Sequence, residues 1–194
     1  MSNDEIPVDV QKMLSPLFEA HGRALSALSQ IEACLSMIFA RCMQGADQET
    51  SYIAFDAIQL TSPKIRVLRA VAKHHFSREL LDPTGHFERL NKILKRIEAR
   101  TEFRTKLAHW IGSTLHVEDL FNNISNTKYE LRLVPPWNSK KNLNFIPTET
   151  ISITDIELFT HKCYVICNDL IRSNLKLGGI NILESMLNND AVSA

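Results

Sequence analysis

A chain of 194 residues with 44% hydrophobic side chains favours one domain with a sizeable core. Its 22 basic side chains are balanced by 22 acidic ones, which argues against a dedicated duplex-DNA binder, because such proteins carry a basic excess. No apolar run approaches the ~18 residues of a membrane span. The acidic start, residues 1–5, lacks the basic and apolar blocks of a secretory signal. We therefore expect a cytoplasmic protein that makes no membrane contact.

The four cysteines all fall on the apolar faces of expected helices: Cys34, Cys42, Cys163 and Cys167. Buried free thiols pack as small hydrophobes, and a reducing compartment keeps them in that form. Cys163 and Cys167 are one helical turn apart with His161 nearby, so a metal site is the alternative. Structural zinc sites take four ligands in paired spacings, and the sequence has no second pair of that kind. We expect core packing, with no metal and no cofactor.

Proline positions and apolar periodicity predict three helices in the first half of the chain. Ser15-Pro16 and Ser62-Pro63 both resemble a helix cap followed by proline at the first helical position. After the first of them comes a stripe that steps by three and four residues: Leu28, Ile31, Leu35, Ile38 and Cys42. A second helix is expected over 49–59 and a third over 63–76.

A long helix is expected from His86 to Trp110, with Gly112 as its end. Its apolar seam runs through Phe87, Leu90, Leu94 and Ile97. The same rhythm continues through Thr101, Arg104, Ala108 and Ile111. An arginine therefore lies where the pattern requires a core residue. Because burial of an unpaired guanidinium is costly, Arg104 is expected to be paired, to line a cavity or to face a second subunit.

Residues 113–150 lack a strong helical pattern and predict a loop with a β-hairpin. Tyr129–Val134 alternates polar and apolar residues, as a half-buried strand does, and Phe145–Ile146 is expected to pair back. Helicity resumes at Thr154–Glu157, which matches a capping box, and residues 180–194 form a tail. The predicted fold is mainly α: a single domain over residues 1–194, with a four- to five-helix bundle and a small β-hairpin before the last long helix.

The predicted helix over 86–110 gives this neutral protein a local positive surface. Residues 88–106 hold seven basic and three acidic side chains, and Lys92, Arg96, Arg100 and Arg104 are spaced by four. A solvated helix face with salt bridges, such as Glu102 to Lys106, accounts for this charge pattern on its own. What favours a functional site is the conjunction of the seam arginine with His109 five residues later.

The segment Arg104-Thr105-Lys106-Leu107-Ala108-His109 resembles the Arg-x4-6-His signature of HEPN domains, the higher eukaryote and prokaryote nucleotide-binding superfamily. The string RTKLAHW is similar to the RNxLAHG form of many HEPN-like bacterial proteins. Thr105 stands where asparagine is frequent, and Trp110 stands where glycine is frequent. The order of elements is similar too: a long first helix, the motif near the end of a later helix, a hairpin, and a last long helix.

The resemblance implies a metal-independent endoribonuclease that acts as a homodimer through the 86–110 helix. RNA supplies the 2′-hydroxyl nucleophile, so the protein needs a proton carrier and a cation for the phosphate. Arg104 would bind the phosphate, and His109 would act as general base or acid. Glu102 and Thr105 would orient His109. The expected RNA contacts are Arg96, Arg100, Lys106 and Trp110.

The family resemblance also implies a toxin or phage-defence role, with a cognate antitoxin or other partner protein. The alternative is a non-catalytic HEPN-like dimeric module that binds a partner protein or nucleotide. In that alternative Arg104 forms a salt bridge to Glu98 or Glu102, and His109 is a structural residue. The sequence leaves both interpretations open.

Overall fold

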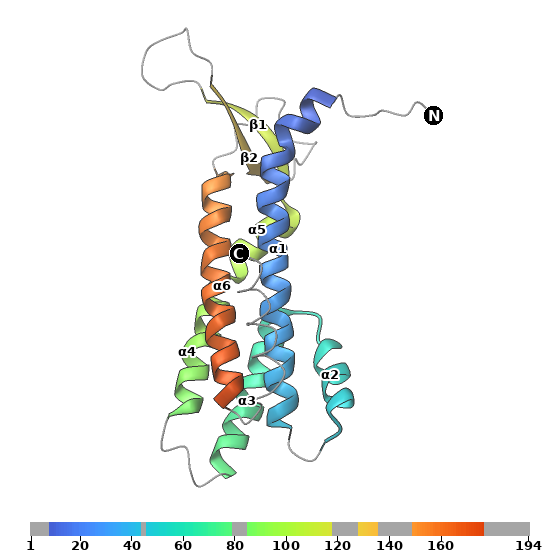
Figure 1. Ribbon diagram of the computed structural model, residues 1–194, viewed down its shortest axis with the longest axis vertical. Helices are drawn as coiled ribbons and strands as arrows, with labels where there is room; N and C mark the ends of the chain where they lie inside the picture. Colours follow the sequence, from blue (N-terminus) through green and yellow to red (C-terminus); the bar gives the residue numbers. More distant parts are fainter. Residues whose placement is uncertain (1–7, 44–45, 79–84, 118–127, 136–148, 177–194) are drawn as a thin grey trace, which may run out of the picture. The chain divides into compact units, whose positions relative to one another are not determined.

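The computed structural model describes residues 8–43, 46–78, 85–117, 128–135 and 149–176 (Figure 1). Its elements, in chain order, are α1 (Val8–Cys42), α2 (Gln48–Asp56), α3 (Thr61–Arg78), α4 (His86–Glu98), α5 (Thr101–His109), β1 (Ile111–Val117), β2 (Lys128–Val134), β3 (Ile151–Ser152) and α6 (Ile153–Lys176). The predicted fold class is confirmed: the protein is mainly helical, with a small antiparallel sheet before the last long helix.

The chain divides into two compact units, each described here by itself. The sheet unit comprises residues 1–26 and 102–161, and therefore contains α5, the three strands and the N-terminal parts of α1 and α6. The helical unit comprises residues 27–101 and 162–194, with α2, α3, α4 and the remaining parts of α1 and α6.

Apolar stripes from several helices form the core of the helical unit. Four of the five residues of the predicted α1 stripe are buried, Ile31, Leu35, Ile38 and Cys42, and the fifth, Leu28, is half-buried. On the predicted α4 seam Leu90, Leu94 and Ile97 are buried and Phe87 is half-buried. The core is completed by buried residues of α3 and α6: Ile65, Leu68, Cys163, Ile166 and Leu170. Full burial of a Leu or Ile side chain contributes roughly 1.5–3 kcal/mol. These stripes therefore hold the helices of the unit together.

The short helix α2 is fixed at both ends. Asp47 caps its N-terminus, where the Thr50 backbone N–H donates to the Asp47 carboxylate at 2.8 Å. This bond lowers the pKa of Asp47 below its ordinary value. Near the other end, the Phe55 ring is fully buried and stacks on Phe39 of α1, with ring centroids 4.7 Å apart.

In the sheet unit the strands form one antiparallel sheet in the order β1-β2-β3. β1 and β2 lie side by side (Figure 1), in a register that runs from Ile111 opposite Val134 to Val117 opposite Lys128. β2 matches the predicted strand, but its described partners, β1 and β3, were not predicted. The predicted partner strand, Phe145–Ile146, lies outside the described residues.

Gly112 was predicted to end a helix, but it lies inside β1. A Cβ at this position would lie 3.2 Å from Leu17 Cδ2 and 3.5 Å from the Phe18 ring. The glycine therefore allows β1 to approach α1 closely. Glycine is required here by close packing between two segments about 95 residues apart in the chain. Local sequence patterns carry no information about such a contact.

Two predicted helix starts are also wrong. α1 begins at Val8 and continues through Pro16, and α3 begins at Thr61 rather than at Pro63. Proline cannot donate the helical bond to the carbonyl four residues earlier. For Pro16 this is the carbonyl of Lys12. Both residues are exposed, so this carbonyl can accept a hydrogen bond from water instead. A proline on the solvent face thus interrupts one bond without ending the helix.

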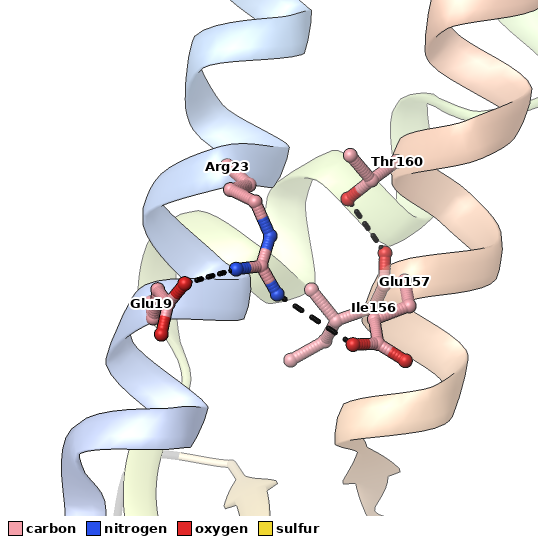
Figure 2. Close-up of polar contacts among 5 residues, drawn as sticks. All are labelled: Glu19, Arg23, Ile156, Glu157 and Thr160. Atoms are coloured by element: carbon pink, nitrogen blue, oxygen red, sulfur yellow. Dashed lines mark hydrogen bonds and ion pairs between the residues drawn. The ribbon is translucent and has the colours of Figure 1, made fainter. Parts of the chain in front are cut away.

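The capping box of α6 forms two residues earlier than predicted. Ser152 N–H donates to the Asp155 carboxylate at 2.9 Å, and Asp155 N–H donates to the Ser152 hydroxyl at 3.1 Å. These are the reciprocal bonds of a capping box. The predicted partner Glu157 instead lies 3.5 Å from Arg23 of α1. Figure 2 shows Arg23 between Glu157 and Glu19, with the Thr160 hydroxyl donating to the Ile156 carbonyl at 2.7 Å.

α1 is long and apolar enough, over Leu14–Cys42, to cross a membrane by length and composition alone. Half of its most apolar stretch is buried inside the protein, and a core helix meets the same criteria.

Candidate functional site

The predicted 86–110 helix is two helices, so the expectation of one continuous helix is wrong. α4 ends at Glu98, and α5 begins at Thr101. Between them the Arg100 N–H donates to the Ile97 carbonyl at 3.0 Å, three residues back instead of four. This tighter turn ends the α-helical register. The apolar seam of α4 therefore cannot be extended into α5 by counting residues.

The buried position of α5 is Leu107, whereas Ala108 and Ile111, which the extended seam placed inside, are exposed. Arg104 is half-buried and makes contacts within the chain. His109, the last residue of α5, is exposed. The motif thus occupies a nine-residue helix that presents the histidine to solvent at its C-terminal end.

Two contacts within the sheet unit hold α5 in place. Phe103 stacks on Phe159 of α6, with ring centroids 4.5 Å apart and planes inclined by 20°. His21 of α1 lies with its Nε2 atom 2.7 Å from the Leu107 carbonyl oxygen. Because a carbonyl only accepts, Nε2 carries the hydrogen of this bond.

His21 thereby satisfies one of the carbonyls that a helix leaves without an intrahelical partner at its C-terminus. The neighbouring carbonyl, that of Lys106, accepts from the Trp110 backbone N–H at 2.8 Å. The last turn that carries His109 is therefore held by its own helical bond and by His21 of α1. Sequence reasoning missed His21, because it lies 86 residues from Leu107 and no local pattern marks the contact.

Lys106, predicted to contact RNA, is enclosed by acidic groups. Its ammonium group lies 2.9 Å from Glu102 and bonds to Glu149, and the hydrogen bond to Glu149 is the main reason that its pKa is raised. The same ammonium lies over the Trp110 ring, 5.5 Å from the centroid. The predicted pair between Glu102 and Lys106 is confirmed. An RNA phosphate at Lys106 would therefore compete with two carboxylates.

The remaining predicted RNA contacts, Arg96 and Arg100, belong to the helical unit, whereas Arg104 and His109 belong to the sheet unit. Arg96 forms an ion pair with Asp169 of α6 at 2.5 Å. Arg100 donates to the Arg96 carbonyl at 2.6 Å. Glu98, a predicted partner of Arg104, accepts from Arg69 at 2.8 Å, and the other predicted partner, Glu102, pairs with Lys106. Thr105 is exposed on α5.

All four cysteines are free and buried. Cys34 of α1 and Cys167 of α6 lie with their sulfur atoms 3.6 Å apart, a contact that the sequence did not predict. The hydrogen bond from Cys34 lowers the pKa of the Cys167 thiol to about 7, and the same bond with burial raises that of Cys34. Burial raises the pKa of Cys163 to about 11. Within the described residues, no three His, Cys, Asp or Glu side chains are grouped to hold a metal ion.

Comparison with protein-family models, with curated proteins and with solved structures finds no match to this chain. The functional argument therefore depends on the geometry and chemistry of its own residues.

Proposed function

We propose that the protein is a metal-independent endoribonuclease that cleaves single-stranded RNA, with the Arg-x4-His motif of a HEPN-like protein on α5. One observation supports this most directly. α5 ends on an exposed histidine, five residues after a half-buried arginine, and a dedicated bond from His21 anchors its last turn.

The two side chains suit cleavage through the 2′-hydroxyl of RNA. A histidine exchanges protons near neutral pH, so His109 takes the proton of the 2′-hydroxyl or returns one to the leaving 5′-oxygen. Arg104 supplies a fixed cation with forked donors to the phosphate oxygens. The new bond joins the 2′-oxygen to phosphorus and the bond to the 5′-oxygen breaks. The products are a 2′,3′-cyclic phosphate and a 5′-hydroxyl.

A second subunit completes the proposed site. Five residues along an ideal helix separate two side chains by about 140° around the axis, so Arg104 and His109 of one α5 point to different sides. In a homodimer the arginine of one subunit meets the histidine of the other across a shared cleft. Glu102 and Thr105, on α5 with His109, would influence its orientation.

The test is incubation of the purified protein with labelled single-stranded RNA in EDTA. Wild type cleaves the RNA and leaves cyclic-phosphate ends, whereas Arg104→Ala and His109→Ala do not. Matched controls are His161→Ala, an exposed histidine of α6, and Arg66→Ala, an exposed arginine of α3; both keep the activity. Intact RNA with the wild-type protein at every concentration would overturn the proposal.

The second candidate is a non-catalytic dimeric module that binds a partner protein, such as an antitoxin, or a nucleotide. The pairing of Lys106 with two carboxylates and of Arg96 with Asp169 favours it, because these cations are already compensated within the chain. This candidate predicts a dimer that Arg104→Ala dissociates, with no RNA cleavage. A toxin or defence role predicts that expression of wild type slows bacterial growth and that His109→Ala relieves the effect.

A further inference from the structure

The helical unit contains a cavity of about 310 Å³ between residues of α3, α4 and α6. Its size lies at the lower end of the range for small-molecule sites, roughly 300–1,000 Å³. None of the proposed catalytic residues lines it. The inference drawn from it is independent of the ribonuclease proposal.

The charged groups that line the cavity are mostly cations. Three come from one face of α4 at steps of three and four residues, and Arg172 comes from α6. The three are Arg89, Lys92 and Arg96. The one carboxylate of the lining is Asp169, which is held by Arg96 at 2.5 Å.

Three of these cations have no acidic partner among the residues that the structure describes. The side chains of Arg89, Lys92 and Arg172 are exposed and form no ion pair or hydrogen bond there. Like charges that face one concave surface raise the local positive potential and attract an anion. The guanidinium groups of Arg89 and Arg172 present forked donors, which match phosphate oxygens better than a single ammonium does.

The rest of the lining is largely aromatic and apolar. The His86 ring stacks on the Phe76 ring, with centroids 6.2 Å apart and planes inclined by 29°. Leu90 and Ile93 continue this surface. His86 is also the first residue of α4, which follows Gly85 in the left-handed conformation at φ 63°. The positive end of the helix dipole therefore lies at this end of the cavity.

We infer that this cavity binds a small ligand with two or more phosphate charges, whose planar part lies against the aromatic wall formed by His86 and Phe76. Arg89, Lys92 and Arg172 hold the phosphate groups. Arg96 stays paired with Asp169 and shapes the cavity floor. A free nucleoside polyphosphate and the 5′-triphosphate end of an RNA carry the same chemistry, and the binding experiment separates these two sources.

The experiment is isothermal titration calorimetry of the full chain with three probes: ATP, inorganic pyrophosphate, and a 5′-triphosphorylated RNA decamer compared with its 5′-hydroxyl form. The double variant Arg89→Gln/Arg172→Gln is expected to bind each phosphate probe at least about tenfold more weakly, because it removes two charge-assisted contacts. The matched control Arg66→Gln/Lys95→Gln removes the same charge from exposed positions of α3 and α4 outside the cavity. It is expected to change the Kd by less than about twofold at moderate salt.

The variant His86→Ala tests the aromatic wall. It should weaken the binding of ATP by about fivefold, within the range for loss of one base-stacking contact, and leave the binding of pyrophosphate unchanged. Tighter binding of the decamer than of ATP, lost in the double variant, assigns the site to an RNA end; the reverse order assigns it to a free nucleotide. The inference is overturned if wild type binds none of the phosphate probes, or if both double variants weaken binding equally.

Discussion

The two basic regions of this protein differ in how their charges are balanced. On α5 the ammonium of Lys106 is held by Glu102 and Glu149 and lies over the Trp110 ring. In the cavity of the helical unit, three cations have no described partner and only Arg96 is paired. The comparison teaches that a run of basic residues in a sequence does not measure an available positive charge. What matters is which carboxylates the fold brings to it.

The largest expected effect separates the two regions by function. His109→Ala should lower the rate of RNA cleavage by about 10²–10⁴-fold, because it removes the proposed proton carrier. The cavity variant Arg89→Gln/Arg172→Gln should leave that rate within about threefold, since its residues make no contact with the reacting atoms in the proposed mechanism. The measurement is the initial rate of cleavage of a labelled RNA in EDTA. Equal losses of the cleavage rate in the two variants would show that the two regions act as one site.

The next effect tests how α5 is held. Leu107→Ala should lower the free energy of unfolding by about 2–5 kcal/mol, as other fully buried leucines do. Leu107 is 1% exposed and is the buried residue of α5. The matched control is Leu158→Ala in the same unit, which is 52% exposed and should cost less than about 0.5 kcal/mol. Urea denaturation followed by circular dichroism measures both values, and similar costs would show that Leu107 is not a core residue.

A smaller effect concerns the anchor that sequence reasoning missed. His21→Ala removes the donor to the Leu107 carbonyl and should cost about 1 kcal/mol. It should also speed hydrogen exchange of the amides in the last turn of α5, because that turn loses its hydrogen bond to α1. The control His74→Ala changes an exposed histidine of α3 and should alter neither quantity. Unchanged exchange in His21→Ala would show that α5 does not depend on this bond.

The smallest effect is a pH dependence at the start of α6. Hydrogen bonds from Ser152 lower the pKa of Asp155 below its ordinary value of 3.8. A carboxyl whose pKa is lower in the folded state stabilises the protein above pH ~4, and this contribution disappears as the pH falls through the folded value. Asp155→Asn should therefore be less stable than wild type at pH 7, by at most about 1 kcal/mol because the site is exposed. Melting temperatures that converge between the two proteins below about pH 3 would support this.

Much of the helical architecture follows from periodicity alone. The stripe on α1 and the seam on α4 predicted most of the residues that these helices bury, because a helix that buries one face must repeat apolar residues at steps of three and four. The strand β2 was predicted from its alternation for the corresponding reason. The Arg-x4-His motif was also found locally, from a short string of residues.

Other features depend on segments that are distant in the chain. The contact between Cys34 and Cys167, the bond from His21 to Leu107 and the approach of Leu17 to Gly112 each join residues from different elements. Local patterns also failed where one rule competed with another. The α4 helix ends at Glu98 although no glycine or proline marks this point in the sequence. The capping box of α6 forms at Ser152, although Thr154 offered a similar pattern.

The sequence by itself determined most of the helical segments, the inward faces of α1 and α4, and the presence of an arginine and a histidine five residues apart. Only the tertiary structure decided what each charge does. The positive charge of Lys106 is balanced by Glu149, which lies 43 residues away in the chain. Arg89 and Arg172, in contrast, line one cavity with no acidic partner described. Helix periodicity is a local property of the backbone, but electrostatic balance depends on distances between groups that only folding brings together.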